Sequence, residues 1–167
     1  MAQLHLVGTT LSAEAKKSSG DIADAYGRSA FNRYYYAAYL ATRDLLIRFN
    51  PKWDVSHAGA PELVESALPA LVRKEAKRLQ KINALTHADE QRICSGVASA
   101  GAAIGELLRI AYKVRVISDY RPEEQVCFDK STFHLDDHTE GEARSWLSTV
   151  EMHKGRILKF GKELELV

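Results

Sequence analysis

Several features are scarce in this 167-residue chain, and each scarcity excludes a class of protein. The two cysteines, Cys94 and Cys127, are too few and too isolated for a disulfide framework or a zinc site. Four prolines and 46% hydrophobic residues favour one folded domain with a proper core. The formal net charge of +1 gives no overall basic field, so any nucleic-acid site must be local.

Targeting and membrane segments are also missing from the sequence pattern. Residues 1–17 contain no basic run followed by an apolar stretch, and no window reaches the roughly 20 apolar residues of a membrane span. Walker-type loops, nucleophile elbows and zinc-ligand spacings are absent too. We therefore expect a cytoplasmic protein in a reducing compartment, with no cofactor, no metal and no membrane attachment.

Apolar residues recur with helical spacing along most of the chain. Ser18 or Ser19 can cap a helix that begins near Asp21 and ends at Asn50, before Pro51. Its predicted buried stripe consists of Phe31, Tyr35, Ala38, Thr42, Leu45 and Phe49. Its opposite face carries Arg28, Asn32, Tyr36, Tyr39 and Arg43.

The remaining helices follow a loop through Trp53 and His57. A short helix over 60–68 and a basic helix over 69–82 come first, and Thr86 with Asp89 then resembles a capping box that opens the longest helix. That helix should run to about Asp119. Its buried stripe consists of Ile93, Val97, Ala100, Ile104, Leu107, Ala111 and Val114.

The last part of the chain is predicted as a loop followed by a helix. Residues 123–139 have no sustained period and should form a loop, in which 126–128 has the composition of a short strand. An amphipathic helix then begins near Glu142. Its core-facing residues are Trp146, Val150, Ile157, Phe160 and Leu164.

These segments predict an all-α fold, an up-and-down bundle of four to five helices. We expect a single helical domain over 1–167, with an N-terminal extension at 1–18 and a loop insertion at about 121–140. Gly96, Gly101 and Gly105 lie inside the longest helix, where glycine costs about 1 kcal/mol relative to alanine. They predict close helix packing, either within the bundle or across a dimer seam.

The tyrosines mark a candidate site. All seven fall in two windows, 26–39 and 112–120; the first also contains Arg28 and Arg33, and the second contains Arg115. Aromatic rings and guanidinium groups from two distant helical segments can stack bases or hold phosphate where the helices meet. A tyrosine-rich core is the alternative.

The strongest constellation is the end of the longest helix, around Arg115 and Tyr120. Residues five apart on an ideal helix point about 140° apart, so the two side chains should converge only if the helix ends between them. In one interpretation Arg115 pairs with Asp119 and Tyr120 packs under the following loop. In the other, Arg115 binds a phosphate and Tyr120 donates a hydroxyl or provides a stacking platform. Lining residues would be Asn32, Arg33, Tyr36, Tyr39, His57, Tyr112 and Asp119.

Two charged segments add further candidates. Arg73, Lys77 and Lys81 follow one ridge of the basic helix, which suits an RNA backbone or a solvated face. Residues 119–142 contain eight acidic side chains against two basic ones, an excess that would repel nucleic acid and could dock a basic partner. His134 and His138 near Asp136 and Asp137 have metal-ligand chemistry, but a solvated loop is the simpler interpretation.

Several of these residues together resemble a bacterial HEPN domain (higher eukaryotes and prokaryotes nucleotide-binding). The resemblance covers roughly residues 20–165. It rests on the run 32–39, on His57 with Gly59, on 115–120 and on the final amphipathic helix. It implies a small helical bundle, usually dimeric, that in many members is a metal-independent ribonuclease of a toxin or antiphage system.

In such enzymes the motif is Arg followed four to six residues later by His. The arginine holds the scissile phosphate, and the histidine transfers protons to and from the ribose 2′-hydroxyl. Here Arg115 matches the arginine, but Tyr120 stands where histidine is expected. With a reference pKa of about 10, tyrosine is a poor general base at neutral pH.

The resemblance therefore implies an RNA- or nucleotide-binding module of a toxin–antitoxin or antiphage-defence system, a homodimer in which Arg115 and Tyr120 hold the catalytic positions. Whether it is an enzyme stays open. The alternative is a non-catalytic interaction protein that dimerises through the small-residue helix and docks a partner such as a nucleotidyltransferase or another defence protein.

Overall fold

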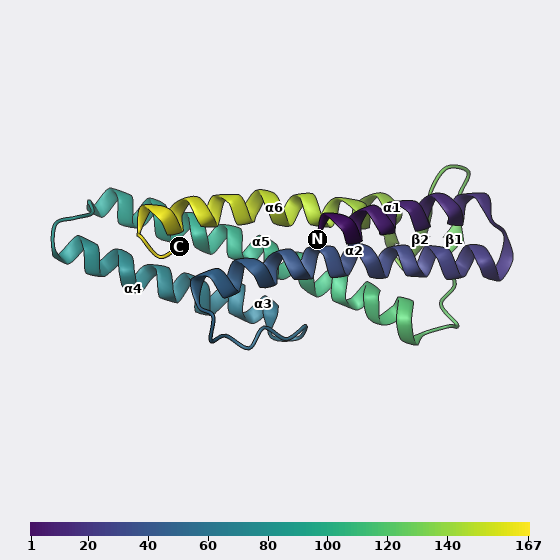
Figure 1. The fold of residues 1–167 in the computed structure, drawn as a ribbon, viewed down its shortest axis with the longest axis horizontal. Helices are drawn as coiled ribbons and strands as arrows, with labels where there is room; N and C mark the ends of the chain where they lie inside the picture. The colour runs from purple at the N-terminus through teal and green to yellow at the C-terminus, as the bar shows by residue number, and fades with distance from the viewer. The chain divides into compact units, whose positions relative to one another are not determined.

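Helices dominate the structure, a computed structural model that describes residues 1–167 (Figure 1). The long helices are α1 (Ala2–Lys17), α2 (Gly20–Phe49), α4 (Leu68–Lys81), α5 (His87–Tyr120) and α6 (Glu140–Glu163). A short α3 (Ala60–Glu62) and a π-helical turn, η1 (Leu63–Ala67), lead into α4. The strands β1 (Cys127–Phe128), β2 (Phe133–Leu135) and β3 (His138–Thr139) form one antiparallel sheet in the order β1-β2-β3. The all-α prediction is confirmed.

The chain forms two compact units. Unit 1 consists of Met1–Leu40 and Leu108–Ser148, and unit 2 consists of Ala41–Leu107 and Thr149–Val167. Helices α2, α5 and α6 contribute residues to both units.

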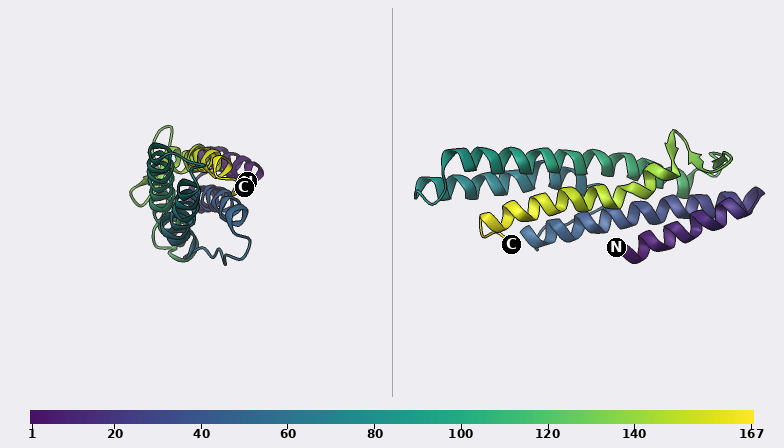
Figure 2. Two further views of the ribbon diagram at one scale, coloured as in Figure 1. Left: turned by 90° about the vertical axis from the view of Figure 1, so that its left-hand side faces the viewer. Right: turned by 90° about the horizontal axis from the view of Figure 1, so that it is seen from above.

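In unit 1, α1 lies along the first half of α2 (Figures 1 and 2). The ring of His5 is 5.5 Å from the ring of Tyr34. Gly20, with a φ of 58°, adopts the left-handed conformation that lets the chain reverse between the two helices. The segment 1–18, predicted as an extension, thus contains a packed helix, and α2 begins at Gly20, close to the predicted start near Asp21.

The small sheet completes the core of unit 1. Phe133 and Leu135 of β2 are fully buried, and the Phe133 ring contacts the Phe31 ring edge-on at 5.7 Å. The prediction of a structureless loop over 123–139 was therefore wrong. The short strand predicted at 126–128 is present as β1.

The predicted helical stripes are confirmed with one exception. The α2 stripe and the α6 stripe are buried throughout. On α5, Leu108 is buried at 2% exposure while the predicted Leu107 is only partly buried. Thr86 caps α5 as predicted, because its hydroxyl accepts a 3.1 Å hydrogen bond from the Asp89 amide.

The glycines of α5 lie where other parts of unit 2 come closest. A Cβ on Gly96 would collide with the Phe160 ring, one on Gly101 with the Val64 carbonyl oxygen, and one on Gly105 with the Glu65 side chain. The predicted close packing is confirmed, and it occurs within a single chain. These glycines therefore provide no argument for a dimer seam.

By length and composition alone, α5 is apolar enough to cross a membrane, and 44% of its most apolar stretch is buried. Core helices of soluble proteins have the same properties, so this is weak evidence. The sequence analysis predicted no membrane-spanning segment, and α5 is the one helix whose length and composition depart from that prediction.

Candidate functional site

The site begins with a helix end that is fixed in place. The last carbonyl groups of a helix have no partners within it, and a cation there also interacts favourably with the helix dipole. Arg28 of α2 supplies both the hydrogen-bond donors and the positive charge at the end of α5. Its guanidinium donates to the carbonyl oxygens of Ser118 (3.0 Å), Ile117 (2.8 Å), Arg121 (2.8 Å) and Glu124. The segment that carries the candidate residues is thereby anchored to α2.

The loop after α5 is anchored by the same part of α2. Asp24, one turn before Arg28, accepts a 2.7 Å hydrogen bond from the Val126 amide. Val126 is itself buried and would contact any side chain added at Gly27. Asp24 and Arg28 therefore set both the end of α5 and the start of the sheet.

Arg115 is the centre of the candidate site. Its Nη2 forms a 3.1 Å ion pair with Asp119, and its guanidinium lies 5.0 Å from the centre of the Tyr120 ring. Nη2 also donates a long, 3.4 Å hydrogen bond to the Tyr120 hydroxyl. Asn32 of α2 donates its side-chain amide to the other oxygen of Asp119. We call these four residues, with Arg33 and Tyr36, the Arg115 cluster.

The electrostatics keep Arg115 firmly charged. Burial lowers the pKa of its guanidinium, but hydrogen bonds with Tyr120 and Tyr36 and the charge of Asp119 outweigh burial and raise the pKa above its usual value. The Arg115 side chain is 17% exposed, and its Nε has no hydrogen-bond partner. An unpaired buried donor on a charged group is able to bind an acceptor.

Arg33 brings a second cation to the cluster. Its guanidinium lies 5.6 Å from the centre of the Tyr36 ring and donates to the Asn32 side chain at 3.3 Å. It has no acidic partner. Arg33 and Tyr36 thus join the cluster through Asn32, which also holds Asp119, while Tyr120 contacts Arg115 directly.

The tyrosines divide into a core set and a surface set. Tyr35 and Tyr39 are 1% and 6% exposed and stack at 6.0 Å, and Tyr112 contacts Tyr35 at 5.9 Å. Burial raises the pKa of Tyr35 far above its usual value. Tyr120, by contrast, is 66% exposed. The tyrosine-rich core is thus present around Tyr35, whereas a binding role for the exposed Tyr120 stays a prediction.

Several predictions for this site need correction. Asn32 and Tyr39 lie on the face of α2 opposite the predicted buried stripe, yet both are buried, and Asn32 contacts Asp119 of α5 there. Tyr120 does not pack under the following loop. Arg115 and Tyr120 meet although α5 continues through both, so the expected break between them is absent.

Other predicted residues belong to unit 2. His57 lies in the loop between α2 and α3, while Arg73, Lys77 and Lys81 are exposed on α4. The Arg115 cluster lies entirely in unit 1.

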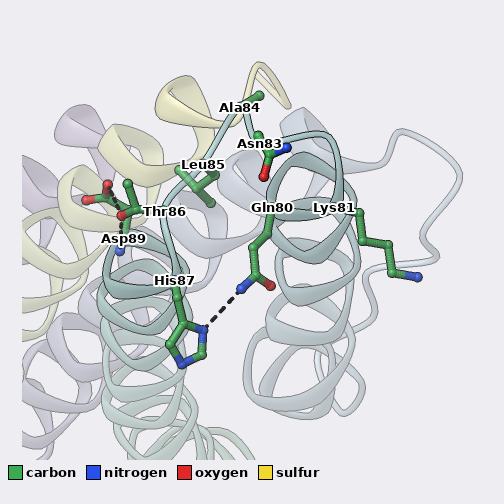
Figure 3. A pocket seen from close by; sticks show the side chains of 8 residues that line it. All are labelled: Gln80, Lys81, Asn83, Ala84, Leu85, Thr86, His87 and Asp89. Carbon is green, nitrogen blue, oxygen red and sulfur yellow. Dashed lines mark hydrogen bonds between the residues drawn. The ribbon is translucent and has the colours of Figure 1, made fainter.

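A cavity of about 500 Å³ lies in unit 2 at the turn from α4 to α5 (Figure 3). The Gln80 side chain hydrogen-bonds His87 Nδ1 at 3.2 Å across it, and the Thr86 hydroxyl donates to Asp89 at 2.7 Å. Lys81 points away from the Gln80–His87 pair (Figure 3). The polar groups at this turn bond mainly to one another, so the cavity alone suggests no chemistry.

No group of three or more His, Cys, Asp or Glu side chains is arranged to hold a metal ion. The side chains proposed as possible metal ligands near His134 make other contacts. Lys113 pairs with Asp136 at 2.9 Å, and the ring of His134 hydrogen-bonds the Asp136 carbonyl group.

Sequence reasoning missed Arg28 and Asp24 as the residues that hold the site. Their signal was present in part, since the spacing of four residues on one face of α2 predicts a shared neighbour. The identity of that neighbour, a helix end about 90 residues away, was not predictable from the spacing.

Comparisons with models of protein families, with curated proteins and with solved structures gave no match.

Proposed function

We propose that this chain is a HEPN-type module of a toxin–antitoxin or antiphage-defence system, and that it binds a phosphate of RNA or a nucleotide at the Arg115 cluster. One observation carries the proposal. The Arg115 guanidinium is held between a carboxylate and an exposed tyrosine at an anchored helix end. Guanidinium groups bind phosphate and carboxylate with the same geometry.

In the free protein Asp119 occupies the place of the ligand. An incoming phosphate would replace the Asp119 carboxylate on Arg115 Nη2, while Asn32 continues to hold the other oxygen of Asp119. Arg33 would add a second positive charge, and the exposed ring of Tyr120 would stack on a base. Asp119 therefore acts as a built-in competitor in this scheme.

Binding and cleavage are separable in this proposal. Metal-independent cleavage of RNA needs a group that takes a proton from the 2′-hydroxyl. No histidine follows Arg115 at the expected spacing, and the phenol of a tyrosine, with a reference pKa of about 10, is intrinsically a poor general base at neutral pH. We expect the isolated protein to bind its ligand and to cleave generic single-stranded RNA weakly or not at all.

The test measures binding of a fluorescent adenosine diphosphate to four variants. Arg115→Gln should weaken binding about tenfold or more, since a charge-assisted hydrogen bond contributes about 1.5–3 kcal/mol. Asp119→Asn should strengthen binding, because it removes the competing charge and keeps the side-chain shape. Lys17→Gln and Glu14→Gln make the same charge changes at an exposed ion pair on α1 and should change little.

Two results would count against the proposal. If the wild-type protein binds neither the nucleotide nor single-stranded RNA, the binding function is wrong. If Asp119→Asn lowers affinity as much as Arg115→Gln does, the ion pair is structural and Arg115 is not a phosphate ligand. Robust RNA cleavage that both Arg115→Ala and Tyr120→Phe abolish would instead make Tyr120 catalytic.

A second function is favoured by the same ion pair. Asp119 already pairs with Arg115 Nη2 and is itself held by Asn32, so the ion pair is also accounted for as a purely structural feature. The chain would then be a non-catalytic interaction protein whose acidic segment 119–142 docks a partner such as a nucleotidyltransferase. Neutralising Glu123, Glu124 and Asp129 would then abolish binding of a purified nucleotidyltransferase, and nucleotide binding would be absent.

A further inference from the structure

One face of α4 is a continuous basic surface in unit 2. The helix buries Leu68, Val72 and Ala76 completely, so its other side faces solvent. That side carries five exposed cations. They are Arg73, Lys74, Lys77, Arg78 and Lys81, which we call the α4 basic face.

The charge on this face is largely uncompensated. Glu75 is the single acidic residue among positions 73–81, and it pairs with Arg78 at 2.6 Å. None of the other four cations forms an ion pair. Cations on a merely solvated helix usually alternate with acidic side chains three or four positions away, and α4 lacks these partners.

The cations are arranged as a row beside a groove. Arg73, Lys77 and Lys81 are four residues apart, so they follow one ridge with steps of about 6 Å along the helix axis. Beside this ridge, a shallow cavity of about 370 Å³ is lined by Lys74, Glu75, Lys77, Arg78 and Lys81. A row of cations next to a groove matches a chain of phosphates better than it matches a single small anion.

We propose that the α4 basic face binds the phosphate backbone of single-stranded RNA, without reading its sequence. This inference rests on the proposed function and extends it, because it adds to the phosphate site of unit 1 a separate RNA contact in unit 2. The cations supply counterion release, the main source of sequence-independent affinity for nucleic acids.

A lipid surface is a poorer match for the same charges. Basic helices that bind membranes insert an apolar face among the lipids. The apolar face of α4 is already used in the core of unit 2, where Leu68, Val72 and Ala76 have no exposure. The phosphate backbone of RNA requires only the charged side.

The experiment measures binding of a fluorescein-labelled 12-nucleotide oligouridine to the full chain across a range of KCl concentrations. The test variant is Arg73→Gln/Lys77→Gln/Lys81→Gln. The control is Lys52→Gln/Lys159→Gln/Lys162→Gln, which makes the same charge change at exposed positions of unit 2 outside α4. Circular dichroism confirms that each variant is folded, and labelled adenosine diphosphate is titrated in parallel.

For single strands, each phosphate contact contributes about 0.7 to the slope of log affinity against log salt. The test variant should therefore lose about two units of slope and bind about 100-fold more weakly at 0.1 M KCl. The control should bind like the wild-type protein, and nucleotide binding should be unchanged in both variants.

Equal RNA affinity in the test and control variants would overturn the inference, and so would weaker binding with an unchanged salt slope. If the wild-type protein binds the nucleotide but no RNA, the α4 basic face has no such role while the phosphate site of unit 1 stands. If the nucleotide fails to bind but RNA binding shows the expected loss, the proposed site at Arg115 is wrong and the α4 basic face is retained. Salt-sensitive self-association that the test variant abolishes, without any RNA binding, would make this face a contact between copies of the chain.

Discussion

Arg115 shows what helix geometry can and cannot predict about a single residue. The angular rule places the Cβ atoms of residues 115 and 120 far apart, and this holds for the backbone. The rule does not include the length of the arginine side chain, whose flexible stem brings the guanidinium within 5.0 Å of the Tyr120 ring. The ion pair of Arg115 with Asp119 was therefore predictable from the i,i+4 spacing, whereas the contact of Arg115 with Tyr120 inside a continuous helix was not.

Glu140 has a deeply buried carboxylate that is held by a network of hydrogen bonds. It is 4% exposed and accepts hydrogen bonds from Tyr34 at 3.0 Å and from Lys16 at 3.1 Å. Burial raises its pKa, but the bonds to Lys16, Ser12 and Tyr34 outweigh burial and hold the pKa below its usual value. Burial, with the charge of Glu140 adding to it, raises the pKa of Tyr34 to about 12. The network joins α1, α2 and the start of α6.

Glu140→Gln should lower the free energy of unfolding by about 1–3 kcal/mol at pH 7, because the amide turns a donor toward Lys16. Since the folded pKa of Glu140 is depressed, its contribution is present above the unfolded pKa and is lost as pH falls through the folded one. The difference between variant and wild type in urea denaturation should therefore shrink in acid. Glu14→Gln, at the exposed Lys17 pair, is the control. Equal losses in the two variants would mean that burial of Glu140 contributes nothing.

At the scale of whole elements, α1 was missed because its contact surface consists of small residues. Its buried positions are Gly8, Ser12 and Ala15, and a Cβ on Gly8 would lie 2.8 Å from the Tyr34 ring. Such a helix packs closely but shows no stripe of large apolar residues, which is the main sequence signal for a buried helix. The long stripes of α2, α5 and α6 carry that signal and were predicted.

Strands β2 and β3 were missed for a different reason, although the short strand at β1 was predicted. Its strands are two or three residues long, and only Phe133 and Leu135 alternate with a less buried neighbour. A period of two cannot be recognised over three residues, so the periodic signal that would have predicted β2 and β3 was absent.

The glycines of α5 and α6 provide a matched test of element packing. Gly101→Ala should destabilise the protein by about 1–3 kcal/mol, because the new methyl group meets the rigid Val64 carbonyl. Gly155 also lies within a helix, α6, but a methyl group added there meets no neighbouring atom. Gly155→Ala should therefore stabilise the protein by about 0.5–1 kcal/mol. Thermal and urea denaturation measure both. Equal effects in the two variants would show that α5 and η1 separate readily.

At the scale of the whole molecule, near-neutral net charge conceals two opposite regions. Residues 119–142 are strongly acidic, whereas α4 carries the basic face. Charge averaged over the chain is thus a poor guide to its partners, and the sequence positions of the charges are a better one. The acidic segment belongs to unit 1 and α4 to unit 2, so each unit can be tested with its own variants.

The proposed HEPN relationship also predicts assembly. We expect sedimentation at micromolar concentration to give twice the mass of the chain. Gly101→Ala should leave this mass unchanged while lowering stability, because its close neighbour Val64 belongs to the same chain. A monomeric wild-type protein would exclude the homodimer. The opposite outcome is a dimer that Gly101→Ala converts to monomer at a concentration where circular dichroism shows the variant folded. That outcome would place the small residues of α5 at the seam between subunits, because loss of packing within unit 2 alone cannot change the mass of a folded protein.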